Sequence, residues 1–351
     1  MKVKRKDDKM LRMKQVLWIT AGVAFLGLGL VGTQKYAVGK ESMANHSVVE
    51  AATVTDTAIT EGPTSVHLQW VKKKGKIKVG KTAVFQVESQ EGSLESETIV
   101  WSVSNENKAS ISQNGKLKAK QYGTIIVTAK AGESQISCKL KILPKAVVGL
   151  DAGHQKHANG GLEPIGPGAS TKKPKVAGGT CGVVSRVPEY QFTLDICKKL
   201  KKELKSRGYR VVLTRTSNDV NITNKERAEK INKSGADFCV RVHGDGGASS
   251  ARGASGLYPS GRNAYVGKLS AKSYALSKAI MNHYCKETGI RNRGNVQRDD
   301  LTGTNWSKVP VMLIELGFMT NATEDRYMQS VAGQEAMVTG IADGIDQYVE
   351  K

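Results

Sequence analysis

Apolar and polar residues alternate along the middle of the chain. Between residues 66 and 144, short β-branched runs such as TIVWSVSN, YGTIIVTAK and SQISCKLKIL are separated by turns rich in Gly, Asn and Ser. A period of two places one face of each strand in a core, and closely spaced turns let neighbouring strands pair. The pattern predicts a small all-β sandwich over residues 66–144.

From residue 145 onward, compact apolar runs replace this alternation. Four of them are predicted as strands: AVVGL (146–150), YRVVL (209–213), DFCVRV (237–242) and VMLIEL (311–316). The first, second and fourth are expected to be buried on both faces, as in a parallel sheet that helices cover on each side.

Helical periodicity fills the segments between these runs. Between Pro188 and Gly208, four apolar residues recur at four-residue spacing and predict an amphipathic helix: Phe192, Ile196, Leu200 and Leu204. Further helices are expected over residues 224–233, 268–288 and 333–349. The order of elements predicts an α/β domain over residues 145–351, with a mostly parallel central sheet and flanking helices.

The N-terminal segment has the features of a membrane anchor. Residues 1–15 form a basic tail, and the stretch from Val16 to Gly32 is uncharged. At 1.5 Å per residue this stretch spans roughly 25 Å, so the flanking residues must help it cross a bilayer core of roughly 30 Å. We expect a transmembrane anchor over 16–34, with the N-terminus in the cytoplasm, and a linker over 35–65. A cleaved signal peptide is the alternative; both place the remaining domains outside the cell.

Charge narrows the set of partners. The chain carries 53 basic and 32 acidic residues, a net charge of +21. Such a balance favours polyanions, among them nucleic acid, anionic lipid and anionic wall polymers. Because export removes nucleic acid as a partner, we expect none, and we expect anionic wall polymers and the membrane instead.

The cysteines indicate neither a disulfide framework nor a cysteine metal site, because their number is odd and they form no CxxC pair. Cys197 lies on the apolar stripe of the predicted helix and Cys239 within an apolar strand, where burial accounts for both. Cys181 stands among glycines and has no evident role.

Polar side chains follow the predicted strands where catalytic groups of α/β proteins gather. His154 follows the first strand, His243 follows the third, and Glu315 lies near the end of the fourth. Glu189 stands at the head of the amphipathic helix. Two histidines and a glutamate can hold zinc and leave a position open for water, while a further carboxylate accepts the proton of that water.

Spacing alone leaves alternatives open. His157 could replace His154 as a ligand, and Glu163 could replace Glu189. Asp151 is compatible with a turn, a helix cap or a partner of a metal-bound histidine. Each histidine could equally be an ordinary surface or packing residue.

The ordered set of motifs in the C-terminal domain resembles the zinc-dependent N-acetylmuramoyl-L-alanine amidases of the amidase 3 family. The segments that carry the resemblance are Asp151-Ala152-Gly153-His154, Glu189, Leu213-Thr214-Arg215, Arg227-Ala228, Ala236-Asp237, His243, Ile314-Glu315-Leu316-Gly317-Phe318 and Asn321. The resemblance implies that His154, Glu189 and His243 hold one zinc ion and that Glu315 is the catalytic glutamate.

The resemblance also implies the reaction, which is hydrolysis of the amide between N-acetylmuramic acid and L-alanine in peptidoglycan. The sequence departs from the family pattern in two places, and both affect the contacts expected with substrate. No substrate-binding residue is predicted. The loop after His243 reads Gly-Asp-Gly-Gly, and an insertion over residues 160–186 is expected to form a loop at the rim. The alternatives are an inactive wall-binding or adhesion protein and a zinc peptidase that cuts within the stem peptide.

The β domain is similar to the bacterial immunoglobulin-like domains of group 2. This resemblance rests on Val79-Gly80-Lys81, on Trp101 to Asn105, on Gly115 to Ala119 and on Gly123-Thr124. It implies a spacer or adhesion module, in which Trp101 fills the core.

Overall fold

A computed structural model describes residues 67–89 and 99–350. The predicted basic tail (1–15), anchor (16–34) and linker (35–65) lie outside the described residues. Within the described part of the chain, no helix combines the length and the apolar character needed to cross a bilayer.

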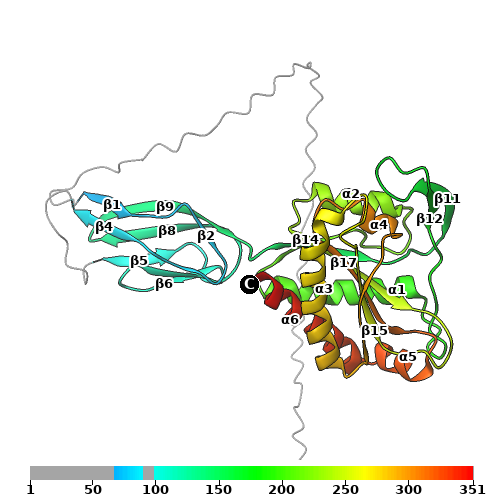
Figure 1. Cartoon of the computed structure of the whole chain (residues 1–351). Coiled ribbons are helices and arrows are strands. Elements are labelled where there is room, and N and C mark those ends of the chain that lie inside the picture. Colours follow the sequence, from blue (N-terminus) through cyan, green and yellow to red (C-terminus); the bar gives the residue numbers. More distant parts are fainter. Residues whose placement is uncertain (1–66, 90–98, 351) are drawn as a thin grey trace, which may run out of the picture. The chain divides into compact units, whose positions relative to one another are not determined.

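Nine short strands form the described part of the β domain (Figure 1). Their bounds are β1 (Leu68–Lys72), β2 (Lys76–Lys78), β3 (Thr82–Val84), β4 (Gln86–Ser89), β5 (Val100–Val103), β6 (Ala109–Ile111), β7 (Lys116–Ala119), β8 (Gly123–Ala131) and β9 (Ser134–Leu143). They form sheets in the orders β2-β9-β8-β5, β3-β7-β6 and β1-β4. Apolar side chains at alternating strand positions pack into one core, as the predicted sandwich requires.

Trp101 lies in the core of the β domain, as predicted. Its ring is 6.1 Å from that of Trp70 and 6.5 Å from that of Phe85, measured between centroids. Gly115 is required beside this cluster because a Cβ there would lie 2.1 Å from the carbonyl oxygen of Phe85. Aromatic packing therefore joins strands that are distant in sequence.

The α/β domain contains a six-stranded sheet in the order β13-β10-β14-β17-β15-β16. Its strands are β10 (Val147–Ala152), β13 (Arg210–Leu213), β14 (Phe238–Asp245), β15 (Ala254–Tyr258), β16 (Asn292–Gln297) and β17 (Val311–Phe318). The first four strands in the sheet order are mutually parallel, whereas β15 runs antiparallel to β17. The prediction of a mostly parallel sheet is confirmed, but β15 and β16 were not predicted.

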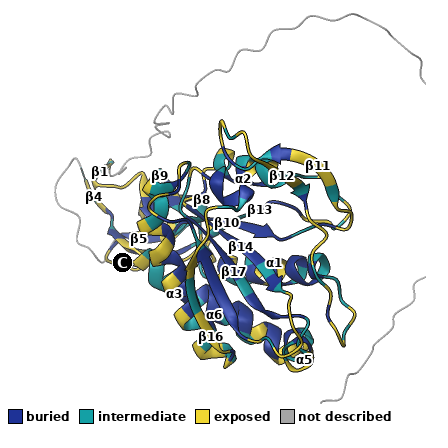
Figure 2. Ribbon diagram, turned by 45° about the vertical axis from the view of Figure 1, so that its right-hand side comes forward, coloured by how far each residue is buried: buried dark blue, intermediate teal, exposed yellow. Residues whose placement is uncertain are grey.

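Helices cover both faces of this sheet. One layer holds α1 (Glu189–Ser206), α3 (Ser270–Thr288), α5 (Ala322–Gln329) and α6 (Val331–Glu350), which share the main core with β10, β14 and β17. The other holds α2 (Asn224–Lys233) and the short α4 (Thr302–Asn305). Figure 2 shows the central strands as buried between these layers. The expected second strand, β13, is only half-buried because it lies at the edge of the sheet.

The predicted helices agree closely with α1, α2, α3 and α6. The start of α2 is fixed by a capping box, in which Thr223 accepts a hydrogen bond from the backbone of Glu226 and the Glu226 carboxylate accepts one in return. The expected loop over residues 160–186 is wrong in part, because it contains the hairpin β11 (Asn159–Pro164) and β12 (Lys172–Val176). Its sequence, rich in Gly, Pro and Lys, lacks the apolar alternation that predicts strands.

We expect Trp101→Ala to lower the free energy of unfolding of the β domain by about 3–5 kcal/mol, because a large ring is removed from a packed core. Val100→Ala on the same strand is the matched control, since Val100 is 58% exposed. Calorimetric unfolding of the two variants measures the difference. Equal stability of the two would show that the aromatic cluster does not organise this core.

Candidate active site

Three side chains that are far apart in the sequence meet at the carboxyl end of the central strands. His154 follows β10, Glu189 is the first residue of α1, and His243 lies near the end of β14. One nitrogen or oxygen from each lies within 4.8 Å of the others. The structure therefore brings together the residues predicted as metal ligands.

Glu189 is the centre of this cluster. Its Oε1 lies 3.2 Å from Nε2 of His154 and 3.0 Å from Nδ1 of His243, and it also accepts a bond from the backbone of Gly244. Its Oε2 accepts a hydrogen bond from the backbone of Thr180. Burial alone would raise the pKa of Glu189, but the two imidazoles hold it well below its ordinary value. Glu189 is therefore a carboxylate.

The contacts of His154 fit a bound cation. Its Nδ1 lies 2.8 Å from the carbonyl oxygen of Ala177, which can only accept, so Nδ1 carries hydrogen. In the neutral ring, Nε2 then directs a lone pair at the Glu189 carboxylate. Such a contact is repulsive unless a proton or a metal ion lies between the two atoms. Burial lowers the pKa of His154, yet the Glu189 carboxylate outweighs it and the net shift is upward.

His243 provides a second indication. Its Nδ1 lies 3.0 Å from Oε1 of Glu189 and is the nitrogen placed to share a cation with it, while its Nε2 is buried and has no hydrogen-bond partner among the described residues. Burial, above all, lowers the pKa of this imidazole, which favours the neutral form that binds metals. Two ligands about 2.0 Å from a tetrahedral zinc lie about 3.3 Å apart, close to the 3.0 and 3.2 Å separations from Glu189. The donor set and its spacing fit zinc.

Glycines make room for the imidazoles. A Cβ on Gly153 would lie 2.5 Å from the ring of His243, so the residue before His154 cannot carry a side chain. Gly179 has a positive φ of 81°, and a Cβ there would lie 2.9 Å from both Glu189 and His154. Both positions require glycine because a side chain would occupy the space of the cluster.

A buried ion-pair network lies beneath the cluster. Asp151 is 2% exposed and accepts bonds from Arg227 at 3.0 Å, Arg241 at 2.9 Å and Thr214 at 2.7 Å. Burial would raise the pKa of Asp151, but the two guanidinium groups hold it well below its usual range. Asp151 is therefore neither a helix cap nor a turn residue nor a partner of a metal-bound histidine. It is the shared counter-charge of two arginines.

Arg227, together with Arg215, fixes the backbone that carries His154. Arg227 donates to the carbonyl oxygens of Ala152 and His154, both at 2.7 Å. Arg215 donates to those of Ala152 and Gly153, at 3.0 and 2.9 Å. His154 has a φ of 58°, a left-handed conformation that a non-glycine residue adopts only when its surroundings impose it. The charged hydrogen bonds supply that constraint.

Glu315 lies beside the cluster on β17. It is the register partner of His243 on the neighbouring strand. Its Oε2 is buried and has no hydrogen-bond partner within the described ranges. Burial first, and then the charges of Glu189 and Asp245, raise the pKa of Glu315 well above its ordinary value. A carboxyl group with this surrounding can hold a proton at neutral pH and exchange it with a nearby group.

The alternative ligands are elsewhere. His157 is exposed, and Glu163 accepts a hydrogen bond from the backbone of Lys225 at the start of α2. Cys197 and Cys239 are buried as predicted, whereas Cys181 is exposed. Arg241 was missed by the sequence reasoning, although a charged residue within the apolar run DFCVRV is a signal that it has a buried partner.

The insertion over residues 160–186 is held in place by hydrogen bonds to the rest of the domain. The indole of Trp306 donates to the carbonyl oxygen of Pro164 at 2.9 Å, and Asn224 donates to that of Lys175 at 2.8 Å. After the hairpin, the carboxylate of Asp325 accepts bonds from the backbones of Val184 and Ser185. These contacts hold the segment from both sides, so it borders the site as a structured rim.

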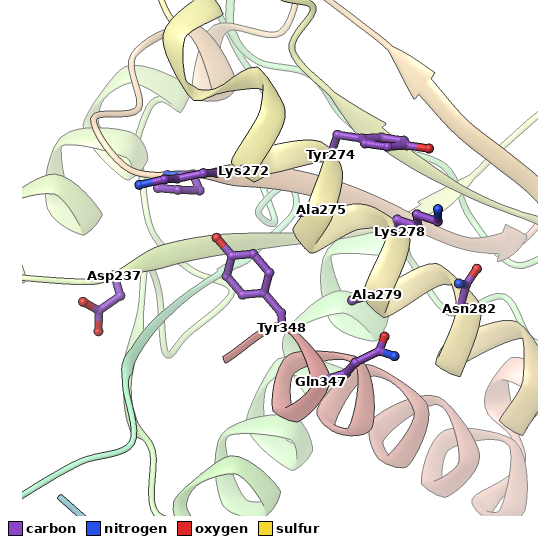
Figure 3. Close-up of a pocket in the computed structure, with 10 residues that line it drawn as sticks. Asp237, Lys272, Tyr274, Ala275, Lys278, Ala279, Asn282, Gln347 and Tyr348 are labelled. Atoms are coloured by element: carbon purple, nitrogen blue, oxygen red, sulfur yellow. The ribbon is translucent and has the colours of Figure 1, made fainter. Parts of the chain in front are cut away.

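A separate cavity of about 570 Å³ lies at the opposite ends of the strands (Figure 3). Asp237 and Pro310, which directly precede β14 and β17, line it together with Tyr274 and Lys278 of α3 and Tyr348 of α6. None of the cluster residues lines it. The cavity is therefore distinct from the candidate active site.

Comparison with known proteins gives two family matches. The family described as N-acetylmuramoyl-L-alanine amidase matches residues 148–347, and the bacterial Ig-like domain (group 2) matches residues 69–140. The N-acetylmuramoyl-L-alanine amidase Rv3717 of Mycobacterium tuberculosis is 27% identical over 237 residues, covering 65% of this chain and 96% of that protein. The amidase AmiA of Escherichia coli is 27% identical over 241 residues, covering 58% and 76%.

A solved structure shares the fold. The crystal structure of the N-acetylmuramyl-L-alanine amidase Ami1 from Mycobacterium smegmatis superposes with a TM-score of 0.54 at 26% identity. The superposition covers 59% of this chain and 98% of that one.

We expect Asp151→Asn to lower the free energy of unfolding by about 3–5 kcal/mol, because two buried guanidinium groups lose their counter-charge. Asp219→Asn, at an exposed position, is the matched control. Urea unfolding at pH 7 measures both. Similar stabilities of the two variants would contradict the role assigned to the network.

Titration of Glu315 should make the stability of the metal-free protein depend on pH. Between the unfolded pKa of about 4.3 and the raised folded pKa, the native state binds more protons than the unfolded state, so stability falls by up to about 1.4 kcal/mol per pH unit as pH rises. Glu315→Gln removes this dependence. Urea unfolding in chelator should show the variant gaining stability over the wild type from about pH 5 upward; a constant difference would mean that the carboxyl group is not held neutral.

Proposed function

The chain belongs to the N-acetylmuramoyl-L-alanine amidase family, and from this premise we propose that it hydrolyses the amide between N-acetylmuramic acid and L-alanine of peptidoglycan with one zinc ion. His154, Glu189 and His243 would hold the ion. The observation that carries the proposal is the convergence of these three ligand atoms beside an unpartnered buried carboxyl group.

Zinc, when bound, supplies Lewis acidity that polarises a carbonyl group and lowers the pKa of water to about 7. Side chains of the protein would carry out the proton transfers. Once the positive charge of a bound zinc ion favours its ionised form, Glu315 would take the proton of the attacking water and later deliver it to the departing amine of alanine. Its buried surroundings suit both steps, because a raised pKa lets one carboxyl group accept and donate a proton near neutral pH.

The scaffold supports this role by holding the ligands before substrate arrives. Glu189 orients both imidazoles, and the carbonyl oxygen of Ala177 fixes which nitrogen of His154 carries hydrogen. Arg215 and Arg227 fix the backbone on which His154 is mounted. Preorganised ligands lose little freedom on binding a metal ion, which favours both affinity and turnover.

We further propose that the enzyme works outside the cell on the wall. The uncharged stretch over residues 16–34 would anchor it in the membrane with the N-terminus in the cytoplasm, and cleavage of this stretch would release it. The net charge of +21 favours contact with anionic wall polymers. The Ig-like domain would act as a spacer between the membrane and the catalytic domain.

The test is hydrolysis of purified peptidoglycan by the protein, with chelator and with added zinc. We expect new amino termini that are all alanine, loss of activity in chelator and recovery with zinc. New termini of another residue would indicate a peptidase, and none at all in the zinc-loaded protein would indicate a wall-binding protein. Either result overturns the proposed reaction.

Variants separate the proposed roles. Glu315→Gln should lower kcat at least about 1,000-fold while zinc content stays near one per chain, because it removes the proton acceptor and leaves the ligands. His154→Ala and His243→Ala should instead lower zinc content, measured by atomic emission. Loss of zinc from the Glu315 variant would show that Glu315 is a ligand.

A further inference from the structure

One sheet of the β domain has a strongly basic outer face. Residues 66–144 contain thirteen lysines and six glutamates, so the domain is positively charged. No acidic residue occurs in the four strands of the sheet β2-β9-β8-β5. The positions of these strands that point away from the core carry five exposed lysines, which together are called the lysine face: Lys76 and Lys78 of β2, Lys139 and Lys141 of β9, and Lys130 of β8.

Lysines of this face lie directly opposite one another. Lys76 is the register partner of Lys141 in the parallel pair of β2 and β9, which places the two Cα atoms about 4.8 Å apart. Lys78 and Lys139 each lie two positions further along the same strands, about 6.6 Å away. Among the described residues, no ion pair or hydrogen bond engages the ammonium groups of the lysine face. Because like charges opposite each other destabilise a sheet, this arrangement costs stability.

Protection of a sheet edge accounts for only part of the lysine face. β2 is an edge strand, and exposed lysines on such a strand prevent it from pairing with other chains. β9 is an inner strand that pairs with β2 on one side and β8 on the other, and lysine is a poor strand former. The lysines of β9 therefore have no role in protecting an edge, and a ligand of opposite charge explains them.

The other residues of the face indicate the class of that ligand. The remaining outward positions of β8 and β9 hold Thr, Ser, Gln and Ile, and none holds an aromatic residue. The exposed apolar residues Ile126 and Val100 are separated by four register positions, about 13 Å, so they form no apolar patch. Single-stranded nucleic acid is bound by stacking its bases on aromatic rings, and peripheral membrane proteins insert aromatic or large apolar residues. The face provides neither.

Ammonium groups suit a flexible chain of phosphates. Lysine binds an anion as a point charge on a mobile stem and does not impose the planar geometry that arginine does. Several lysines spaced about 5–7 Å apart on a flat sheet can therefore contact successive charges of one polymer. Each contact is weak by itself because it is exposed, so affinity depends on their number.

We propose that the lysine face of the Ig-like domain binds an anionic wall polymer whose phosphate groups recur along the chain, and so retains the protein at the wall. The β domain would then be a binding module in addition to a spacer. The choice of a wall polymer rests on the proposed location outside the cell. The face itself is independent of the reaction assigned to the α/β domain.

The experiment measures cosedimentation of the full-length protein, in neutral detergent, with purified cell walls. One set of walls carries its phosphate polymers, and the other has been stripped of them. Chelator is present throughout, so binding is measured without hydrolysis, and a failure of the proposed reaction would leave the result unchanged. We expect affinity at least about tenfold higher for the intact walls, falling as salt is added because exposed charges are screened. Equal affinity for the stripped walls would overturn the inference.

A pair of double variants tests the location of the binding surface. Lys139→Gln with Lys141→Gln should weaken binding to intact walls about tenfold, as expected for the loss of two exposed charge contacts. Lys116→Gln with Lys118→Gln is the matched control, because it removes the same charge from alternate exposed positions of β7 in the other sheet. The control should bind as the wild type does. Equal weakening by both variants would show that only net charge matters, which contradicts a specific face.

Thermal unfolding separates binding from structure. The β9 variant should have a Tm at least as high as that of the β7 control, because it removes the repulsion between Lys76 and Lys141. Lys76→Gln alone removes the same repulsion and should also weaken binding. Weaker binding that is accompanied by a lower Tm in both the β9 variant and Lys76→Gln would assign these lysines a structural role and overturn the inference.

Competition distinguishes a wall polymer from a membrane. A soluble glycerol phosphate polymer and phosphatidylglycerol in mixed micelles are compared at equal phosphate concentration as competitors for binding of the wild type to intact walls. We expect the polymer to displace the protein at the lower concentration. An equal or reversed order would assign the lysine face to anionic lipid and contradict the proposal.

Discussion

The buried carboxylate of Asp151 is the interaction on which the α/β domain depends most. It lies at the end of β10 and joins Arg227 of α2 to Arg241 of β14. Buried charges are tolerated only when they are paired and hydrogen-bonded, so these three elements have one arrangement in which all partners are satisfied. The same arginine of α2 then holds the loop that carries His154 in its left-handed conformation.

The pKa values of two glutamates at the site are shifted in opposite directions because their neighbours differ. Glu189 is surrounded by imidazoles and backbone donors, so the charged form is favoured. Glu315 is buried without a donor and lies near other carboxylates, so the neutral form is favoured. One fold thereby places two carboxyl groups of opposite tendency in the same small space, as the proposed metal ligand and proton carrier require.

The parts of the domain that hold the candidate metal ligands differ from those that form the rim around them. The candidate ligands and Glu315 lie at the ends of buried strands and on the first turn of α1, where packing fixes them. The rim consists of the β11–β12 hairpin and the loop before α4, which are more exposed and are tied together by side chains. Under the proposed function, such a division would let the rim vary in sequence without moving the candidate metal ligands.

The periodicity of apolar residues predicted the β sandwich, four strands of the central sheet and the helices α1, α2, α3 and α6, because it is a local property of the chain. It also supplied His154, Glu189, His243 and Glu315 as candidates, although the choice of His154 over His157 and of Glu189 over Glu163 needed the family resemblance. The fold was needed to establish the partners of Asp151, the edge position of β13, the hairpin within the insertion and the ion pair of Lys173 with Asp300. These depend on which strands lie side by side, and contacts between residues 90 or 127 positions apart are not encoded in local spacing.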